Sequence, residues 1–226
     1  SNCDDTINHA LTPIIKVCSE AADNGFITKK TFSEIKKLRI RVNKGQLSDD
    51  ENRVERHLTE EQMSQLAEYY HNCKEPRRKE YLQMFLFSIN ACGLRFSDVM
   101  TLRWKDIDFS NRMISKVQVK TRGRTTIPLN DAALEILEEW KKLTGRNNFV
   151  FDLINDDTNI NNGMTLYKAR NTATKNVNQS LKIAGEELGL PFDLTFHCAR
   201  HTCSIIAINK WTDISVISRL LGHQST

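Results

Sequence analysis

The stretch that decides the fold is TFHCARHT at residues 195–202, followed by LLGH at residues 220–223. Thr195 is a good N-cap, and the residues after it predict a helix from Phe196 to about Lys210. His197 and Arg200 stand three residues apart, which places them on one face of its first turn. A permanent cation beside an imidazole at a helix N-terminus forms a favourable binding site for an anion. Taken alone, the same residues also fit a helix whose polar side chains merely face water.

Four sequence boxes in a fixed order resemble the tyrosine recombinase family, the integrases of phages and transposons. The two stretches above resemble the family's His-x-x-Arg-His helix and the Leu-Gly-His that ends a later helix. The other two boxes lie upstream: GLRFSD at 93–98 with LRW at 102–104, and KTRG at 120–123 with IPL at 127–129. The resemblance runs from about Leu58 to Thr226 and is weaker over the N-terminal helices. It implies the catalytic-domain fold of tyrosine recombinases.

The chain of 226 residues allows one large domain or two small ones. Few large apolar side chains and many charges occur between residues 43 and 56, so we place a domain boundary near residue 50. Residues 1–50 resemble the last part of the helical core-binding domain of integrases. Residues 51–226 resemble the catalytic domain without its C-terminal tail. The rest of the core-binding domain, and any arm-binding module, is expected outside this chain.

The first fifty residues carry one helix signal and one basic run. An apolar stripe predicts a helix from about residue 5 to residue 24, in which Pro13 either kinks the helix or separates two shorter ones. The run KKLRIR at residues 36–41 is either a solvated edge or a contact to a phosphate backbone. Lys36 and Lys37 are its candidate DNA-binding residues.

Capping and stop signals delimit the helices of the second region. Thr59 and Gln62 form a capping box ahead of a helix. Residues 77–91 predict a longer, largely buried helix that Gly93 ends. Ser97 is expected to cap a short helix through residue 100. Two further helices are predicted at about 131–143 and 166–188, the second as one helix or two.

Side-chain alternation predicts a β-hairpin in the middle of the chain. In a strand at 113–119, the residues Ile114, Lys116 and Gln118 share one side. Residues 125–129 are expected to pair with this strand across a turn at 122–124. The expected fold class is therefore mainly α-helical with one small antiparallel β-sheet (α+β).

The resemblance implies a role for the polar residues of the boxes. By the family pattern, Arg95 and Arg200 bind the scissile phosphate and stabilise the charge of the transition state. Asp98 steadies Arg95. His197 hydrogen-bonds the phosphate and can accept the proton of the nucleophile. His223 contacts the phosphate from the Leu-Gly-His box.

The resemblance makes Lys120 the general acid that protonates the leaving 5′ oxygen of DNA, which a lysine can do if its pKa is lowered. Lys116, Arg122 and Arg124 are close in sequence, so the role can belong to a neighbour. Arg122 and Arg124 are also candidate DNA-binding residues. Outside the family pattern, Lys120 is a hairpin lysine that faces solvent, and Arg95 is a surface arginine in an ion pair.

The nucleophile is expected outside the chain, and no metal or other cofactor is expected. In the family it is a tyrosine roughly nine residues, or two and a half helical turns, beyond the Leu-Gly-His histidine, and this sequence stops at Thr226. The chain as given should therefore not cleave DNA. Two arginines can take the part that a metal ion plays in other phosphoryl-transfer sites. The spacing of His197, His201, Cys198 and Cys203 is not that of a known zinc box.

These residues lead to one interpretation and two alternatives. The leading one is a site-specific recombinase of a mobile element that breaks and rejoins DNA through a 3′-phosphotyrosyl intermediate. Its implied partner is double-stranded DNA, on which a homotetramer is expected, with a monomer in its absence. The alternatives are a catalytically inactive DNA-binding regulator with the same fold, and a type IB topoisomerase.

Composition sets broad limits. A hydrophobic share of 39% and a charged share of 27% are ordinary for a globular protein, and a net charge of +4 tolerates a nucleic-acid partner without demanding one. Six cysteines without a Cys-x-x-Cys pair favour a reduced, cytoplasmic setting. The sequence has neither a signal peptide nor an apolar run long enough to cross a bilayer, so no membrane association is expected.

Overall fold

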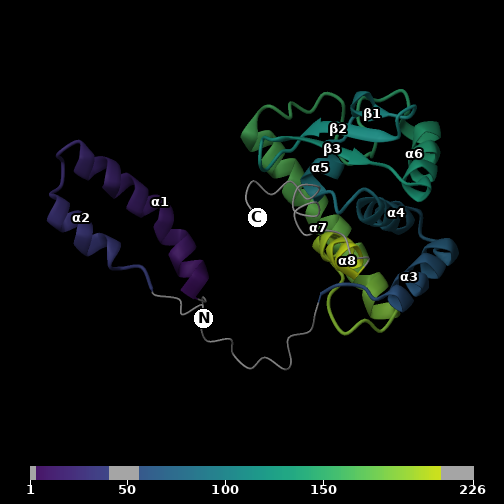
Figure 1. Cartoon of the computed structure of the whole chain (residues 1–226), viewed down its shortest axis with the longest axis horizontal. Coiled ribbons are helices and arrows are strands. Elements are labelled where there is room, and N and C mark those ends of the chain that lie inside the picture. The colour runs from purple at the N-terminus through teal and green to yellow at the C-terminus, as the bar shows by residue number, and fades with distance from the viewer. Residues whose placement is uncertain (1–3, 41–55, 210–226) are drawn as a thin grey trace. The chain divides into compact units, whose positions relative to one another are not determined.

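A computed structural model describes residues 4–40 and 56–209 of the chain. The chain divides into two compact units, residues 1–53 and residues 54–226. The first unit holds two helices, and the second holds six helices, a 3₁₀ turn and three strands among its described residues (Figure 1). Most of the expected linker and the whole LLGH box, with His223, lie outside the described residues.

The first unit is a helical hairpin of α1 (Asp4–Asp23) and α2 (Lys29–Lys36). α1 continues through Pro13 as one helix, which settles the choice that the sequence left open. α2 was not predicted, although Thr28 gives the signal: its hydroxyl accepts the amide of Thr31 at 3.0 Å. The side chain of Asn8 then binds the backbone of Ile40 twice, at 2.8 and 3.0 Å, and so closes the hairpin.

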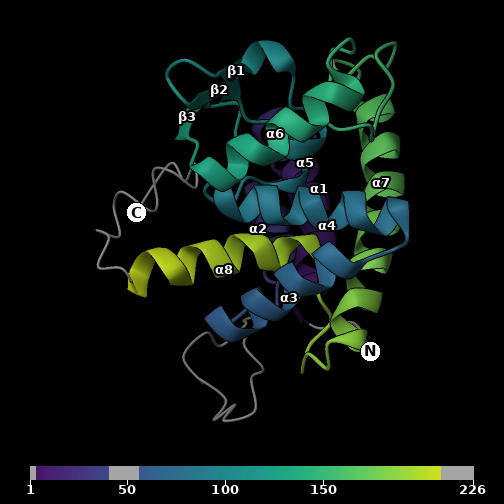
Figure 2. The ribbon, with the colours of Figure 1, turned by 90° about the vertical axis from the view of Figure 1, so that its right-hand side faces the viewer.

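The central helix of the second unit is α4 (Pro76–Asn90). In Figure 2 it runs between α6 (Asp131–Thr144) and α8 (Phe196–Asn209), and it contacts both. It also contacts α3 (Glu60–Asn72), α5 (Phe96–Met100) and α7 (Gly163–Glu187). Its residues 81–85 and 87–89 are buried, as the apolar sequence predicts for a helix that is covered on nearly all sides.

The sheet is antiparallel, with the order β1 (Ile107–Asp108), β2 (Met113–Val117), β3 (Arg124–Pro128). The 3₁₀ turn η1 (Trp104–Asp106) leads into it. Ile114 pairs with Ile127, and both are almost fully buried, so the predicted alternation is confirmed. β2 ends two residues earlier than predicted because residues 118–123 form the connecting loop, and β3 begins and ends one residue earlier than predicted. In Figures 1 and 2 the sheet lies at one end of the second unit and α3 at the other.

The corner between α4 and α5 differs from the prediction. Ser97 was expected to be the N-cap of α5, but Arg95 occupies that position and Ser97 lies in the first turn. The reason is the tight turn before it, where Cys92 and Gly93 both have positive φ, 54° and 66°. Because of this turn, α5 begins at Phe96, two residues earlier than it would if Ser97 were its N-cap.

The remaining helix starts follow capping signals. Thr59 and Gln62 form the predicted capping box of α3. Asn130 caps α6, and its side chain accepts the amide of Ala133 at 2.9 Å. α7 is one helix, and it begins three residues before the predicted position because Asn162 caps it. None of the described helices is long and apolar enough to span a membrane.

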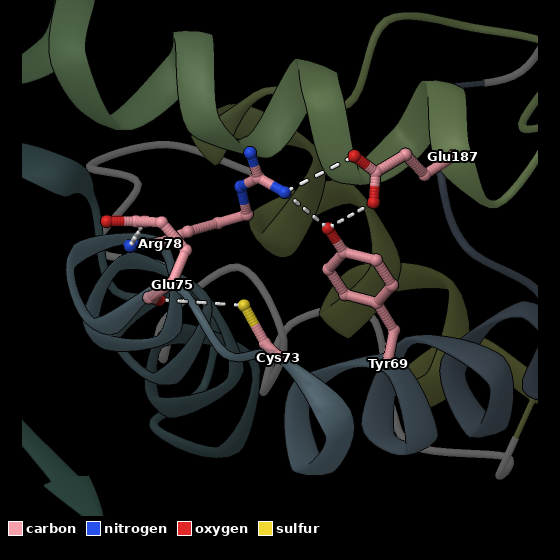
Figure 3. Close-up of polar contacts among 5 residues, drawn as sticks. All are labelled: Tyr69, Cys73, Glu75, Arg78 and Glu187. Carbon is pink, nitrogen blue, oxygen red and sulfur yellow. Dashed lines mark hydrogen bonds and ion pairs between the residues drawn. The ribbon is translucent and has the colours of Figure 1, made fainter.

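A polar cluster joins α3, α4 and α7 (Figure 3). The Tyr69 hydroxyl donates to Glu187 at 2.7 Å and accepts from Arg78 at 2.9 Å. Arg78 also forms an ion pair with Glu187 at 3.3 Å. Beside them, Glu75 caps the first turn of α4 and its carbonyl accepts the thiol of Cys73 at 3.6 Å. We call Tyr69, Arg78 and Glu187 the Tyr69 cluster.

Candidate active site

Two helix N-termini and the hairpin loop meet at the candidate site. Arg95 is the N-cap residue of α5, and His197 and Arg200 belong to the first turns of α8. Arg200 Nη1 donates to the backbone carbonyl of Gly93 at 3.1 Å, which joins α8 to the corner that carries Arg95. Lys120, in the loop, is close enough for its charge to act on His197. The structure therefore brings together Arg95, Lys120, His197 and Arg200, the predicted catalytic residues that it describes.

Arg200 lies in a partly desolvated position beside Arg95. Burial lowers its pKa to about 10, and the charge of Arg95 acts in the same direction. Arg200 thus keeps its positive charge at neutral pH, and the two guanidinium groups repel each other. An anion between them would relieve this repulsion, and a guanidinium offers such an anion two parallel hydrogen bonds.

His197 is an exposed residue at the start of α8. Desolvation of its ring lowers its pKa, and the charges of His201, Arg200, Lys120 and Arg95 lower the pKa further. The imidazole is therefore neutral at pH 7 and able to accept a proton.

His201 is exposed, and its ring lies edge-on to that of His197, with centroids 4.5 Å apart. It is a neighbour of the site on the side that faces solvent. Among the described residues, no group of three or more His, Cys, Asp or Glu side chains could hold a metal ion.

Asp98 is fully buried behind Arg95. Its Oδ1 accepts the backbone amide of Val119 at 2.7 Å, while its Oδ2 has no hydrogen-bond partner among the described residues. Burial raises the pKa of Asp98, and the Val119 bond and the charges of Lys116, Arg95 and Arg200 oppose that shift. Asp98 thus holds the start of the hairpin loop directly and acts on Arg95 through its charge.

Lys116 is buried on the inner face of β2. Its ammonium donates to the backbone carbonyl of Asp98 at 2.8 Å and to the hydroxyl of Thr101 at 3.0 Å, so it fastens β2 to α5. Burial lowers its pKa. Because Lys116 is engaged in this contact, Lys120 remains the lysine of the hairpin whose charge reaches His197.

Lys120 is exposed in the loop 118–123, three residues beyond the end of β2. Arg122 adopts a positive φ of 59°, and its amide donates to the carbonyl of Gln118 at 3.0 Å. This closes the loop around Lys120. Arg122 and Arg124 line a cavity of about 510 Å³ together with the further basic residues Arg103, Lys105 and Lys116.

Comparison with known proteins decides the family. The family model described as "Phage integrase family" matches residues 56–226. The chain belongs to the phage integrase family. A tyrosine recombinase of Thermosipho africanus is 26% identical over 200 residues, which cover 88% of this chain and 61% of that protein. The chain spans between 46% and 61% of the length of three such curated relatives.

Solved structures agree with this assignment at the level of the fold. A lambda integrase dimer bound to a COC′ core site has a TM-score of 0.64 at 18% identity, over 98% of this chain and 57% of that chain. The Tn1549 transposon integrase in complex with circular intermediate DNA has a TM-score of 0.58 at 21% identity, over 98% and 72%. The predicted fold class, mainly helical with a small antiparallel sheet, is confirmed.

In this phage integrase family member, Gln118 has contacts at the site that its sequence position did not indicate. The residue was assigned only to one side of the strand, together with Ile114 and Lys116. Its Oε1 accepts Arg95 Nη1 at 2.9 Å and the hydroxyl of Thr121 at 2.7 Å. The available signal was the position of Gln118 on the same side of the strand as Ile114.

The start of α8 also has a partner that the sequence did not indicate. The side chain of Asn178, on α7, accepts the amide of Phe196 at 2.9 Å and so caps α8 from another helix. Thr195, the predicted cap, has its hydroxyl 3.4 Å from the sulfur of Cys198. No local pattern could have identified Asn178, because it lies 18 residues away along the chain.

The other candidate DNA-binding residues belong to the first unit. Lys36 ends α2 and Lys37 follows it, and both side chains are exposed. Lys37 forms an ion pair with Glu34 at 2.7 Å. Both lysines border a shallow surface depression together with Ser33 and Arg39.

Proposed function

We propose that this chain is the catalytic region of a site-specific recombinase that breaks and rejoins DNA for a mobile element. The observation that supports it is the meeting of Arg95, Arg200, His197 and Lys120 at one site, in a member of the phage integrase family. Relatives of the chain are named tyrosine recombinases and integrases, and two of its structural neighbours were solved with DNA.

The two arginines bind the scissile phosphate in this proposal. Each guanidinium donates to non-bridging oxygens, and both charges are fixed before the substrate arrives. When a nucleophile attacks phosphorus, negative charge grows on these oxygens, so donors that are already in place stabilise the transition state more than the ground state.

Proton transfer is divided between His197 and Lys120. By the family pattern the nucleophile is a tyrosine encoded beyond Thr226, and neutral His197 accepts its proton. The tyrosine oxygen forms a bond to phosphorus while the bond from phosphorus to the 5′ oxygen breaks, and Lys120 gives that oxygen its proton. The 3′-phosphotyrosyl bond keeps the energy of the phosphodiester, so a 5′ hydroxyl of a second strand can reverse the reaction.

The remaining assignments follow from the same proposal. Residues 51–226 form the catalytic domain, and residues 1–50 form part of a core-binding domain whose Lys36 and Lys37 contact the DNA backbone. Arg122 and Arg124 contact DNA beside the hairpin, and His223 reaches the scissile phosphate. A homotetramer assembles on two duplexes during strand exchange, because four strands must be cut and rejoined.

The test uses the chain extended through the residues encoded after Thr226, incubated with a nicked half-site DNA. The proposal expects a protein–DNA band that resists SDS and disappears when the added tyrosine is changed to phenylalanine. Salt-sensitive binding to a validated half-site without such a band would favour the inactive DNA-binding regulator. Relaxation of plasmids that lack a target site would favour the topoisomerase.

A further inference from the structure

The inner face of β2, together with the residue that follows the strand at 118, carries polar side chains at positions that a small hairpin would normally fill with apolar ones. Ile114 is fully buried there as expected, but Lys116 and Gln118, two and four residues on, are exposed by only 6% and 2%. Burying an amide or an ammonium costs free energy unless each finds hydrogen-bond partners. These two residues find them on α5 and in the hairpin loop, so they form connections between elements and not a packing layer.

Gln118 connects the two parts of the candidate site through one atom. Its Oε1 accepts Arg95 Nη1 at 2.9 Å, from the N-cap position of α5. The same oxygen accepts the hydroxyl of Thr121 at 2.7 Å. Thr121 is the residue directly after Lys120, so this oxygen joins the arginine of one sequence box to the loop that carries the lysine of another.

Three further hydrogen bonds of backbone amides hold the loop at residues 118–123. The Val119 amide donates to Asp98 at 2.7 Å. The amide of Gln118 donates to the carbonyl of Gly123 at 2.9 Å, and the amide of Arg122 donates to the carbonyl of Gln118 at 3.0 Å. Lys120 therefore extends from a loop whose two ends are fixed, and its own side chain remains exposed.

We propose that Gln118 is a positioning residue, which sets the phosphate-binding arginine and the general-acid lysine relative to each other. This inference rests on the proposed function, because Arg95 and Lys120 have these roles only there. The amide fixes one nitrogen of the Arg95 guanidinium and leaves the others to a phosphate. Through Thr121 it also sets the direction from which Lys120 reaches the 5′ oxygen.

The first test reads the loop itself and needs no reaction. Trypsin cuts after Lys120 and Arg122 only when the loop opens, so the rate of cutting reports on its anchoring. In the chain as it stands, Gln118→Ala should increase the cutting rate at these two bonds about three- to tenfold, with the urea midpoint of the whole unit nearly unchanged. Thr126→Ala, an exposed change on β3, is the matched control and should leave the rate unaltered. Equal rates for Gln118→Ala and the wild type would overturn the inference.

The second test separates the two contacts of Gln118, to Arg95 and to Thr121, by changing the leaving group of the reaction. In DNA with a 5′-bridging sulfur at the cleavage position, the departing thiolate is a weak base and needs no general acid. In the extended protein, Thr121→Val keeps the bond to Arg95 but loses the link to the loop. It should cut ordinary DNA about tenfold more slowly or worse, and cut the sulfur-containing DNA at nearly the wild-type rate.

Gln118→Ala should recover only partly on the sulfur-containing DNA, because Arg95 has also lost its partner. If Thr121→Val were equally slow on both substrates, or normal on both, Gln118 would have no effect on the lysine and the inference would be wrong. Lys120→Ala, run beside them, must recover on the sulfur-containing DNA if the lysine is the acid. Failure of the wild-type protein to cut either substrate would count against the proposed function, and the trypsin test would still judge the anchoring.

A conservative variant distinguishes positioning from folding. Gln118→Glu keeps an acceptor oxygen for both Arg95 and Thr121, so its loop should resist trypsin as the wild type does. Its negative charge competes with phosphate for Arg95, so cleavage of both substrates should fall by about tenfold or more. A Glu variant that cuts DNA normally would show that the contact to Arg95 has no bearing on the reaction.

Discussion

The guanidinium of Arg200 donates a 3.1 Å hydrogen bond to the backbone carbonyl of Gly93, which lies 107 residues earlier in the chain. Gly93 has a φ of 66° in a buried corner, and the chain reaches Arg95 two residues later. The two predicted phosphate-binding arginines are therefore brought together by the backbone of one tight turn. The position of each depends on that turn keeping its shape.

Removing the second arginine tests its part in the chemistry. Arg200→Ala in the extended protein should reduce single-turnover cleavage by about 10²- to 10³-fold, the usual effect of losing one donor to a transition-state oxyanion. Binding of the intact duplex, measured by gel shift, should change little because many phosphate contacts remain. Arg112→Ala, at an exposed pair with Asp131, is the control. Wild-type cleavage by Arg200→Ala would show that the site is assigned wrongly.

Changing the turn tests the dependence of both arginines on Gly93. An L-residue at a φ of 66° is strained, so Gly93→Ala should lower the free energy of unfolding by about 1–2 kcal/mol. Cleavage should fall as well, because the turn sets the position of Arg95. Gly163→Ala, where an added Cβ meets nothing within 4 Å, should cost little in urea unfolding. Equal stability of the two variants would mean that the corner can relax.

The buried carboxyl of Asp98 predicts a pH dependence of stability. Burial raises its pKa above the ordinary value of 3.8. The folded chain then holds this proton more tightly than the unfolded chain, so the contribution of Asp98 is fully present below pH 3.8 and is lost as the pH rises through the raised pKa. Asp98→Asn keeps an oxygen for the Val119 amide and removes the charge. It should therefore be more stable than the wild type at pH 7, with the difference shrinking as the pH falls toward 4.

Urea unfolding of both proteins from pH 4 to pH 8 measures this difference. A constant loss of stability in Asp98→Asn across the range would contradict the account, because it would mean that geometry at Val119 outweighs the cost of the buried charge. Cleavage by Asp98→Asn should be slower than that of the wild type in either case, since the charge behind Arg95 is gone.

The Tyr69 cluster should contribute to stability and not to catalysis. Tyr69→Phe removes the hydroxyl that joins Arg78 and Glu187, and it should cost about 0.5–1.5 kcal/mol in urea unfolding. Tyr70→Phe, at the next position of the same helix, is the matched control and should cost less. Glu187 is about half exposed, with 52% of its side-chain surface accessible, so a larger effect would not be expected of its pair with Arg78. Similar losses in the two variants would argue against the cluster.

Local signals were sufficient to predict most of the helices. The capping box of Thr59 and Gln62, the apolar run of α4 and the alternation around Ile114 each depend on neighbours in the sequence, and each was confirmed. Ser97 was assigned wrongly as a cap because the two positive φ angles before it cannot be read from residue types alone. α2 was missed because eight residues with few apolar side chains give a weak periodic signal.

The site itself was predicted through the resemblance, residue by residue, while the contacts among its residues were not. The link from Gln118 to Arg95 joins two sequence boxes across a fold, and the bond from Arg200 to Gly93 does the same. Such contacts depend on tertiary packing, which no pattern of spacing encodes. Lys116 was placed on the same side of the strand as Ile114, but neither its burial nor its partners on α5 were predicted.

The most direct test of the central claim removes a negative charge from the DNA substrate. A methylphosphonate at the cleavage position removes the negative charge that Arg95 and Arg200 are proposed to stabilise. In the extended protein, Arg200→Ala should cut this neutral DNA far faster than it cuts ordinary DNA and should approach the wild-type rate. If Arg95→Ala and Arg200→Ala were as slow on the neutral substrate as on the charged one, the two arginines would not act on the phosphate, and the proposed reaction would have to be abandoned.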